Sequence, residues 1–217
     1  MFLLFINKVK FMFKSFIIVL ENHQWGQQLA SEACESAAKH GWNLEKFKAV
    51  DGRNLNMDKC LDSYNLKLFT KHKKQVTSMK RPGVFGNLLS HYNLWKLCSE
   101  LNEPIGCFEH DVLFQNSPTL IDMSFTNLCR LDKLTLQKNY STGQCWNGAH
   151  AYILKPEGAR RLLNWSHTNG VTCADIMIGT DVVDIAFDAN QLVIFNPKQE
   201  LNEKGYSPYS TSKTITF

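Results

Sequence analysis

The feature that most constrains the fold is a short apolar run that ends in acidic residues, at positions 104–111 (PIGCFEHD). A continuous apolar run of this length between polar residues is typical of a buried strand, so residues 105–108 are predicted to lie inside a sheet. Glu109 and Asp111 then fall where the strand leaves the core, which is where open α/β sheets bind ligands. The segment therefore predicts an α/β sheet with an acidic site at one edge.

The two acids are predicted to share one site. Alternate residues of an extended segment point to the same side, which groups Glu109 with Asp111 and turns His110 away. One or two carboxylates can hold Mg²⁺ or Mn²⁺, and such an ion neutralises the charge of a departing diphosphate. The alternative interpretation is a strand end with two solvated acids, because motifs this short often occur by chance.

Strand and helix patterns alternate along the rest of the chain. Apolar runs predict further strands at residues 16–20, 47–50, 148–154 and 192–195. Apolar residues at helical spacing predict helices through Leu29, Ala33 and Ala37, through Leu88, Tyr92, Trp95 and Cys98, and from Pro156 through Leu162. Residues 53–80 are polar and predict an irregular excursion with short helices. This alternation is typical of an α/β nucleotide-binding sheet.

Composition limits the domain count and the kind of ligand. A chain of 217 residues with 44% hydrophobic content can bury one full core. We expect a single domain at residues 16–199, an N-terminal extension at residues 1–15 and a loosely held tail at residues 200–217. A net charge of +4 suits an anionic ligand such as a nucleotide diphosphate but is too small for a nucleic-acid surface. No glycine-rich phosphate loop is present, which disfavours kinases and dinucleotide enzymes and leaves a metal to hold the phosphates.

Cysteines and the amino-terminal residues bear on the compartment. The seven cysteines are odd in number and scattered, without a Cys-x-x-Cys pair, and predict reduced thiols and a cytoplasmic location. The apolar amino-terminal segments are interrupted by Lys8, Lys10 and Lys14, so neither is long enough to span a membrane. Peripheral membrane contact through Phe2, Phe11 and Phe13 remains open.

Three blocks resemble glycosyltransferase family 25, which includes lipooligosaccharide (lipopolysaccharide-type) and collagen galactosyltransferases. They lie at residues 47–52, at residues 83–91 with Trp95, and at residues 108–112. Weaker similarity follows in the expected order at residues 148–154, Gly158, Ala159, Asp175, Pro197 and Gln199. The chain departs from the family pattern at His110, which replaces the middle acid of a Glu-Asp-Asp triple.

The resemblance implies a GT-A-type fold with one Rossmann-like mixed sheet flanked by helices, a UDP-hexose donor, a divalent metal and inversion at the anomeric carbon. Carried onto this chain, it implies that Asp111 holds the metal and that Glu109 is a second ligand or a ribose contact. It places Ser90 and His91 near the donor and Asp51 and Gly52 at its nucleoside end. Asp175 is then the candidate base on the acceptor side, with Asp181, Asp184 and Asp188 as rivals.

These observations predict a metal-dependent enzyme that transfers a hexose, galactose or glucose, from a UDP-sugar to a hydroxyl of a glycan or protein acceptor. The Mn²⁺ or Mg²⁺ ion is the expected cofactor. Two alternatives remain open. One is a non-catalytic relative that binds sugar nucleotides, suggested by His110 and by the absence, after Leu20, of the arginines usual in the family. The other is a metal-dependent phosphoester hydrolase. Several of these residues also have a structural interpretation: Ser90 as a cap or a bond within its helix, His91 as a satisfied core or surface histidine, Asp51-Gly52 as a common turn, and Asp175 as the partner of a lysine or a helix cap.

Overall fold

The structure, a computed structural model, describes residues 13–71, 73–132, 142–146 and 148–197. Its centre is a six-stranded mixed sheet in the order β2-β1-β3-β6-β5-β7, beside a two-stranded sheet β4-β8. The strands are β1 (Lys14–Val19), β2 (Leu44–Lys48), β3 (Ile105–Glu109), β4 (Val112–Phe114), β5 (Leu128–Arg130), β6 (Ala151–Leu154), β7 (Ile185–Phe187) and β8 (Val193–Phe195). The helices are α1 (Gln24–Lys39), α2 (Met57–Ser63), α3 (Lys73–Met79), α4 (Pro82–Leu101), α5 (Pro156–Asn169) and α6 (Ala174–Met177), with single 3₁₀ turns η1 (Gly52–Asn54) and η2 (Pro118–Leu120).

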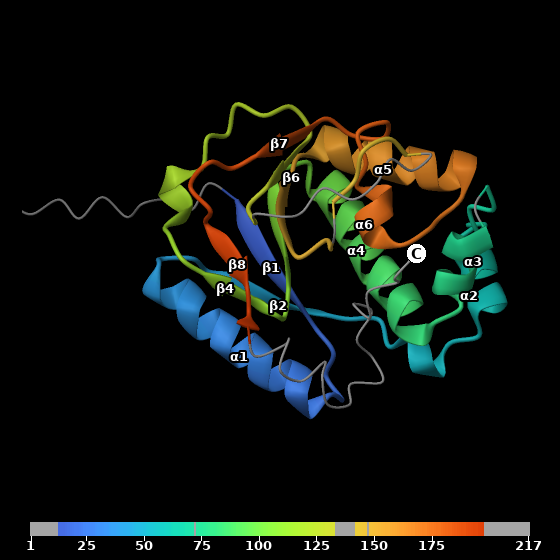
Figure 1. Cartoon of the computed structure of the whole chain (residues 1–217), viewed down its shortest axis with the longest axis horizontal. Helices are drawn as coiled ribbons and strands as arrows, with labels where there is room; N and C mark the ends of the chain where they lie inside the picture. Colours follow the sequence, from blue (N-terminus) through green and yellow to red (C-terminus); the bar gives the residue numbers. More distant parts are fainter. Residues whose placement is uncertain (1–12, 72, 133–141, 147, 198–217) are drawn as a thin grey trace, which may run out of the picture.

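The central sheet separates two apolar cores. Along β1, Phe16 and Ile18 face one core, which also contains apolar residues of α4 and α5, whereas Ile17 and Val19 face the core under α1, β4 and β8. Figure 1 shows α1 and the β4-β8 pair on one side of the sheet and α4 and α5 on the other. The molecule is therefore layered, and the predicted class, α/β with one mixed sheet flanked by helices, is confirmed.

Strand β6 is the one antiparallel strand of the described six-stranded sheet, in which β5 also pairs in parallel with β7. Strand β1 pairs in parallel with β2 and β3, as expected for strands joined by helical crossovers. Strand β6 runs antiparallel to both β3 and β5. The carboxyl ends of β3 and β5 consequently lie at the same edge as the amino end of β6, and this edge carries the acidic pair.

Local sequence explains both ends of α1. The His23 Nδ1 atom accepts a hydrogen bond from the Gly26 amide at 3.0 Å, which caps the first turn. The buried face contains Leu29, Ala33 and Ala37, as the predicted stripe requires. Just past the helix end, Gly41 has φ +80°, a conformation that a glycine adopts without steric cost.

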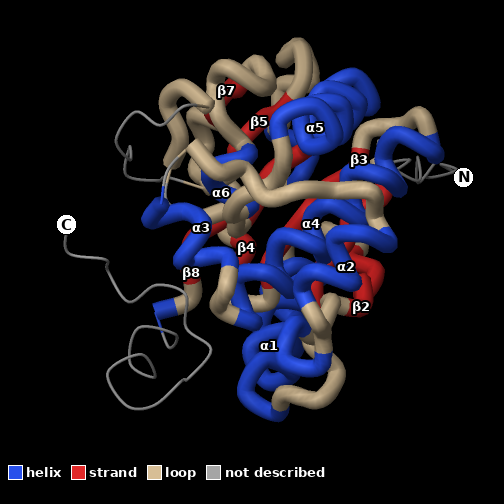
Figure 2. The backbone as a smooth tube through the Cα atoms, turned by 90° about the vertical axis from the view of Figure 1, so that its right-hand side faces the viewer, coloured by secondary structure: helices blue, strands red, loops and turns tan. Residues whose placement is uncertain are grey.

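The excursion between β2 and α4 is made of short helices, as predicted. Figure 2 shows α2 and α3 beside α4. The turn after β2 packs directly on the first turn of α4. A Cβ atom added to Gly52 would contact the Pro82 carbonyl oxygen, and one added to Gly86 would lie 2.4 Å from the Val50 carbonyl oxygen. Both positions therefore need glycine because two backbones approach closely.

All five predicted strands are present, with ends shifted by a few residues, whereas β4, β5 and β7 were not predicted. Strand β1 begins at Lys14, inside the predicted extension, and the predicted tail at residues 200–217 lies outside the described residues. The domain boundaries stay a prediction.

Two further expectations concern thiols and membranes. All seven cysteines are free, and burial raises the pKa of Cys98, Cys129, Cys145 and Cys173 to about 12. No helix in the described part of the chain is long and apolar enough to cross a membrane. Phe13 packs edge-on against Trp42, and Phe2 and Phe11 lie outside the described residues, so peripheral membrane contact stays a prediction.

Candidate metal centre and donor site

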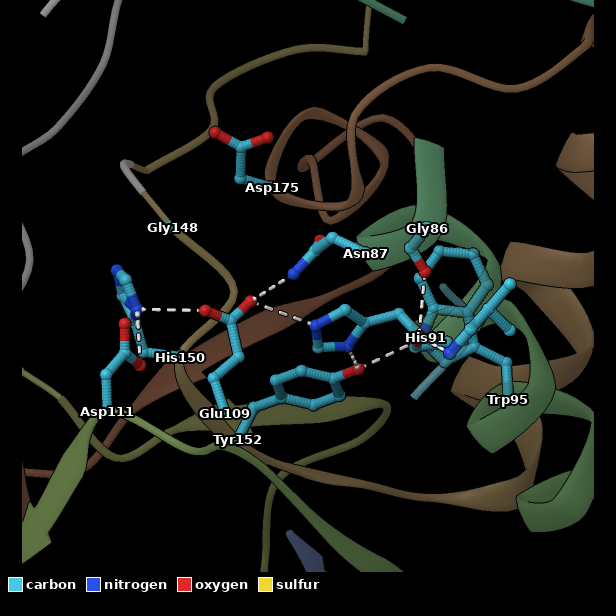
Figure 3. A network of polar contacts seen from close by, with 12 residues as sticks. Gly86, Asn87, His91, Trp95, Glu109, Asp111, Gly148, His150, Tyr152 and Asp175 are labelled. Carbon is cyan, nitrogen blue, oxygen red and sulfur yellow. Dashed lines mark hydrogen bonds and ion pairs between the residues drawn. The ribbon is translucent and has the colours of Figure 1, made fainter. Parts of the chain in front are cut away.

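Three ionisable side chains meet at the edge of the sheet where β3 ends and β6 begins. The His150 Nδ1 atom lies 3.3 Å from Glu109 Oε2 and 3.8 Å from Asp111 Oδ1. The ligand atoms of Glu109, Asp111 and His150 all lie within 4.8 Å of one another. Figure 3 shows the imidazole of His150 beside both carboxylates. The structure thus brings together the two predicted acids and adds a histidine.

Backbone register explains this meeting. Strands β3 and β6 are antiparallel with Phe108 opposite Ala151, and the Glu109 amide donates to the His150 carbonyl at 2.8 Å. Glu109 and His150 are therefore cross-strand neighbours, whose side chains share one face of the sheet. His110 points to the other side, where its ring lies against Gly26 of α1. It contributes no ligand to the acidic cluster, in agreement with the expectation that it faces away.

The pKa values of the two carboxylates are shifted in opposite directions. Burial alone would raise the pKa of Glu109, but the charge of His150 and the hydrogen bonds from His91 and Asn87 hold that pKa well below its usual range. Burial raises the pKa of Asp111, only partly offset by His150 and His110, and the charge of Glu109 adds to the rise. Asp111 is thus a buried carboxyl group, and the positive charge around it is too small to offset the effect of burial on its pKa.

For His150, nearby charges outweigh the effect of burial on the pKa. Burial would lower the pKa of His150, but the carboxylates of Glu109, Asp111 and Asp132 together raise it above its ordinary value. Three acids around one imidazole leave the cluster short of positive charge whenever His150 is neutral.

Unpaired buried atoms show that the cluster fits a metal ion. Asp111 Oδ1 and His150 Nδ1 are buried and have no hydrogen-bond partner of adequate geometry. Leaving such atoms unpaired costs roughly 1–3 kcal/mol each. One imidazole nitrogen and two carboxylate oxygens form a donor set suited to a divalent cation, and an ion there would satisfy both unpaired atoms. The residues present therefore fit the expected Mn²⁺ or Mg²⁺.

A buried hydrogen-bond chain holds Glu109 in place. Trp95 Nε1 donates to the Tyr152 hydroxyl at 3.0 Å, which lies 2.8 Å from His91 Nδ1. The other ring nitrogen of His91 lies 3.1 Å from Glu109 Oε1, to which Asn87 Nδ2 also donates at 2.8 Å. Because the indole can only donate, the Tyr152 hydrogen is free to point at His91 Nδ1, which leaves His91 Nε2–H to donate to Glu109. Figure 3 shows this chain from Trp95 to Glu109.

The predicted donor residues on η1 and α4 have structural contacts of their own. The Ser90 hydroxyl donates to the Gly86 carbonyl at 2.7 Å and accepts from the Val50 amide at 2.8 Å, so it joins α4 to the end of β2. Asp51 caps η1 and pairs with the Arg53 guanidinium at 2.7 and 2.5 Å, and the hydrogen bond from Arg53 lowers the pKa of Asp51. Ser90 and His91 are fully buried, so their described contacts position other groups.

Asp175, the predicted base, lies in the first turn of α6. Its Oδ1 accepts a hydrogen bond from the Ile176 amide at 3.0 Å. Burial raises the pKa of Asp175, and the charge of Glu109 raises it further. Figure 3 places Asp175 beside Gly148 and outside the hydrogen-bonded network of Glu109. Asp175 therefore lies outside the acidic cluster, and in Figure 3 its carboxylate points away from Glu109.

Two of the three rival carboxylates are engaged elsewhere. Asp184 lies 3.3 Å from the guanidinium of Arg161 on α5, and Asp188 accepts hydrogen bonds from Asn190. The Asp181 amide donates to the Thr142 carbonyl at 3.0 Å, and the Asp181 carboxylate lies beside Gly143.

Sequence reasoning missed His150 and Asn87 as site residues, and Tyr152 as the hydrogen-bond partner of His91. The residues around His150 were identified as a strand, and only its antiparallel pairing with β3 places the imidazole beside Glu109. Asn87 lies on α4, four residues before His91, and this helical spacing is the signal that puts both side chains on Glu109.

Comparison with known protein families identifies a match over more than half of the chain. The sequence profile of glycosyltransferase family 25 (LPS biosynthesis protein) matches residues 12–142, more than half of the chain. The chain belongs to glycosyltransferase family 25. This confirms the resemblance stated from the sequence blocks, and with the mixed sheet it confirms the GT-A-type fold class and the glycosyltransferase enzyme class. No curated protein sequence matches the family 25 chain.

Solved glycosyltransferase structures are distantly similar. A mutant of Drosophila β1,4-galactosyltransferase 7, in complex with manganese, UDP-Gal and xylobiose, is 10% identical, with 82% of this chain and 66% of that chain covered and a TM-score of 0.42. The apo form of mouse xyloside xylosyltransferase 1 is 10% identical, with 80% and 84% covered and a TM-score of 0.42. A glycosyltransferase for the major capsid of PBCV-1 is 9% identical, with 71% and 68% covered and a TM-score of 0.36. The chain spans 66% of the length of the Drosophila enzyme.

Proposed function

We propose that this family 25 chain is a metal-dependent, inverting glycosyltransferase. It moves a hexose, galactose or glucose, from a UDP-sugar to a hydroxyl group of a glycan or protein. The observation that carries the proposal is the buried cluster of Glu109, Asp111 and His150, in which Asp111 Oδ1 and His150 Nδ1 lack hydrogen-bond partners. A cation that completes this cluster would face the diphosphate of the donor.

Asp111, Glu109 and His150 are the proposed metal-holding residues. When bound, the ion supplies positive charge to the departing diphosphate oxygen. The imidazole favours Mn²⁺ over Mg²⁺, because Mg²⁺ prefers oxygen ligands and retains water. The hydrogen bonds from His91 and Asn87 keep Glu109 ionised and fixed. Glu109 is therefore ready to act as a metal ligand or to accept a hydrogen bond from a ribose hydroxyl.

Asp175 is the proposed base. Its carboxylate takes the proton of the acceptor hydroxyl, the hydroxyl oxygen bonds to the anomeric carbon, and the bond from that carbon to the diphosphate breaks. Inversion follows from this single displacement. A pKa raised by burial suits a base that must hold a proton near neutral pH, and the Ile176 amide keeps the carboxylate oriented.

The remaining site residues are proposed to shape the donor pocket. Asp51 and Gly52 line the nucleoside end of the donor pocket. Ser90 and His91 are buried and act indirectly: Ser90 holds the turn after β2, and His91 holds Glu109. The catalytic domain at residues 16–199, a cytoplasmic location and the absence of a nucleic-acid partner belong to the same proposal.

The first experiment titrates the purified protein with UDP-galactose and UDP-glucose, with Mn²⁺ present and then chelated, and follows thermal stability and UDP release together. Stabilisation that depends on Mn²⁺, with slow release of UDP, supports the transferase and identifies the donor. Stabilisation without release across a broad acceptor panel favours the non-catalytic relative. No stabilisation, combined with phosphate release from simple esters, favours the hydrolase.

A further inference from the structure

A second buried charged pair lies behind the candidate metal centre and has no part in the proposed reaction. Arg130 is fully buried and Asp132 nearly so. The Arg130 Nε atom lies 3.5 Å from Asp132 Oδ1, whereas Arg130 Nη1 and Asp132 Oδ2 have no hydrogen-bond partner. A buried ion pair of this kind is weak evidence for stability, because apolar residues of similar volume often stabilise a core equally well.

The sheet register places this pair beside the metal centre. Arg130 lies opposite Tyr152 where β5 pairs with β6, and the Leu131 amide donates to the Ala151 carbonyl one step further along. Continuing the antiparallel register puts Asp132 opposite His150. His150 therefore has Glu109 as its neighbour on one strand and Asp132 as its neighbour on the other.

Arg130 also holds the turn that precedes His150. Its Nη2 donates to the Gly148 carbonyl at 2.5 Å. Gly148 has φ +75°, and a Cβ atom on it would lie 1.9 Å from His150 Nε2, so this backbone lies directly against the imidazole. Phe195 of β8 packs edge-on against the same ring, with 5.1 Å between the centroids. Figure 3 shows Gly148 and His150 next to the carboxylates.

These contacts enclose the imidazole on three sides. Gly148 limits where the ring can lie, Phe195 limits its tilt, and the carboxylate of Asp132 lies in the row beside it. Arg130 both bonds to the Gly148 turn and pairs with Asp132. Groups in this outer position orient metal-ligating histidines and tune their affinity.

We propose that Arg130 and Asp132 are positioning residues that fix the His150 imidazole at the metal centre and so set the affinity for the divalent ion. The inference rests on the proposed metal site. Arg130 acts through the Gly148 turn, and Asp132 acts through its place beside His150.

The test is a double-mutant cycle on Mn²⁺ affinity, measured by calorimetry without any sugar donor. Arg130→Lys keeps the positive charge but cannot bridge Asp132 and Gly148 with separate guanidinium nitrogens. We expect Mn²⁺ to bind about 10–100-fold more weakly to this variant. In a His150→Ala background, the same substitution should change the remaining affinity less than about twofold, because the residue it positions is gone. Arg161→Lys on the exposed face of α5 is the matched control and should bind Mn²⁺ like the wild type.

Several results would overturn the inference. An equal loss in both backgrounds would show that Arg130 acts on the centre independently of His150, and no loss would show that it does not act at all. If Arg130→Lys does not fold, as judged by thermal unfolding, the isosteric Asp132→Asn variant decides in the same cycle. Wild-type protein that binds no Mn²⁺ would refute the proposed metal site together with the inference, whereas Mn²⁺ binding that responds to Asp111→Asn but not to Arg130→Lys would refute the inference alone.

Discussion

Asp111 and Glu109 are chemically alike and two residues apart, yet their environments separate them. Glu109 receives hydrogen bonds from His91 and Asn87, which stabilise its ionised form. Asp111 keeps a buried oxygen without a hydrogen-bond partner, and its pKa is raised by burial. Glu109 is thus ionised and held in place before any ligand binds, whereas the unpaired oxygen of Asp111 gains a partner only when a cation binds.

The raised pKa of His150 predicts that pH acts oppositely on the metal-free and metal-bound protein. A folded-state pKa above the unfolded value of about 6.5 stabilises the metal-free fold below that pH, and this contribution is lost as pH rises through the folded-state pKa. Mn²⁺ needs the deprotonated ring, so its affinity should rise over the same range, by up to roughly tenfold per pH unit for each proton released. Calorimetric titrations between about pH 6 and pH 9 check this, and an affinity that does not change with pH would contradict it.

Asp175→Asn separates proton transfer from metal binding. We expect kcat to fall about 10²–10⁴-fold, because the amide cannot take the acceptor proton. Mn²⁺ affinity should stay within about twofold of the wild type, since Asp175 is not part of the three-residue cluster. Steady-state kinetics and calorimetry on the same preparation measure both quantities. Unchanged kcat would transfer the role of base to another residue.

Among the elements, η1 packs on α4. The turn η1 contains Gly52, at the predicted nucleoside end of the donor pocket, and α4 is the helix that supports Glu109. Gly52 and Gly86 let the two backbones touch, and the Ser90 hydroxyl joins them through Val50 and Gly86. A shift of η1 relative to α4 would therefore reach Asn87 and His91, which bond to Glu109 from the same helix.

Gly52→Ala should destabilise the fold by about 1–3 kcal/mol or more, because its methyl group would overlap the Pro82 carbonyl oxygen of the α4 backbone. Gly41→Asn is the matched control. Nothing lies within 4 Å of a Cβ atom there, and asparagine tolerates the left-handed conformation, so the change should stay within about 0.5 kcal/mol. Urea unfolding of both variants gives the comparison. Equal stabilities would mean that the turn can move away from α4 at little cost.

The elements also show which signals the sequence contains. Strand β3 with its acids could be predicted because an apolar run followed by polar residues is a local pattern. Strands β5 and β7 are three residues long, too short to show a period, and both were missed. His150 was missed as a site residue for a different reason: its neighbours Glu109 and Asp132 lie at the end of β3 and just beyond the end of β5, and strand pairing depends on the whole sheet.

For the whole molecule, the sheet places one apolar core on each face and leaves its charged row at an edge. Glu109 ends β3, His150 directly precedes β6 and Asp132 lies two residues beyond the end of β5, so the centre exists only when the sheet is assembled. Binding of an ion to the folded state alone then stabilises the entire fold, by about 2.7 kcal/mol at a concentration of 100 Kd. Metal binding and global stability should therefore change together.

The most direct test of the metal centre is electron paramagnetic resonance of Mn²⁺ titrated into the wild type, Asp111→Asn and the control Asp58→Asn, an exposed carboxylate in the first turn of α2. The signal of free Mn²⁺ should be lost at one equivalent per chain with the wild type and with Asp58→Asn. With Asp111→Asn it should persist, because losing a ligand weakens binding by more than the roughly 10–100-fold typical of outer groups. Asp111→Asn that removes the free signal as effectively as the wild type would contradict the proposed centre.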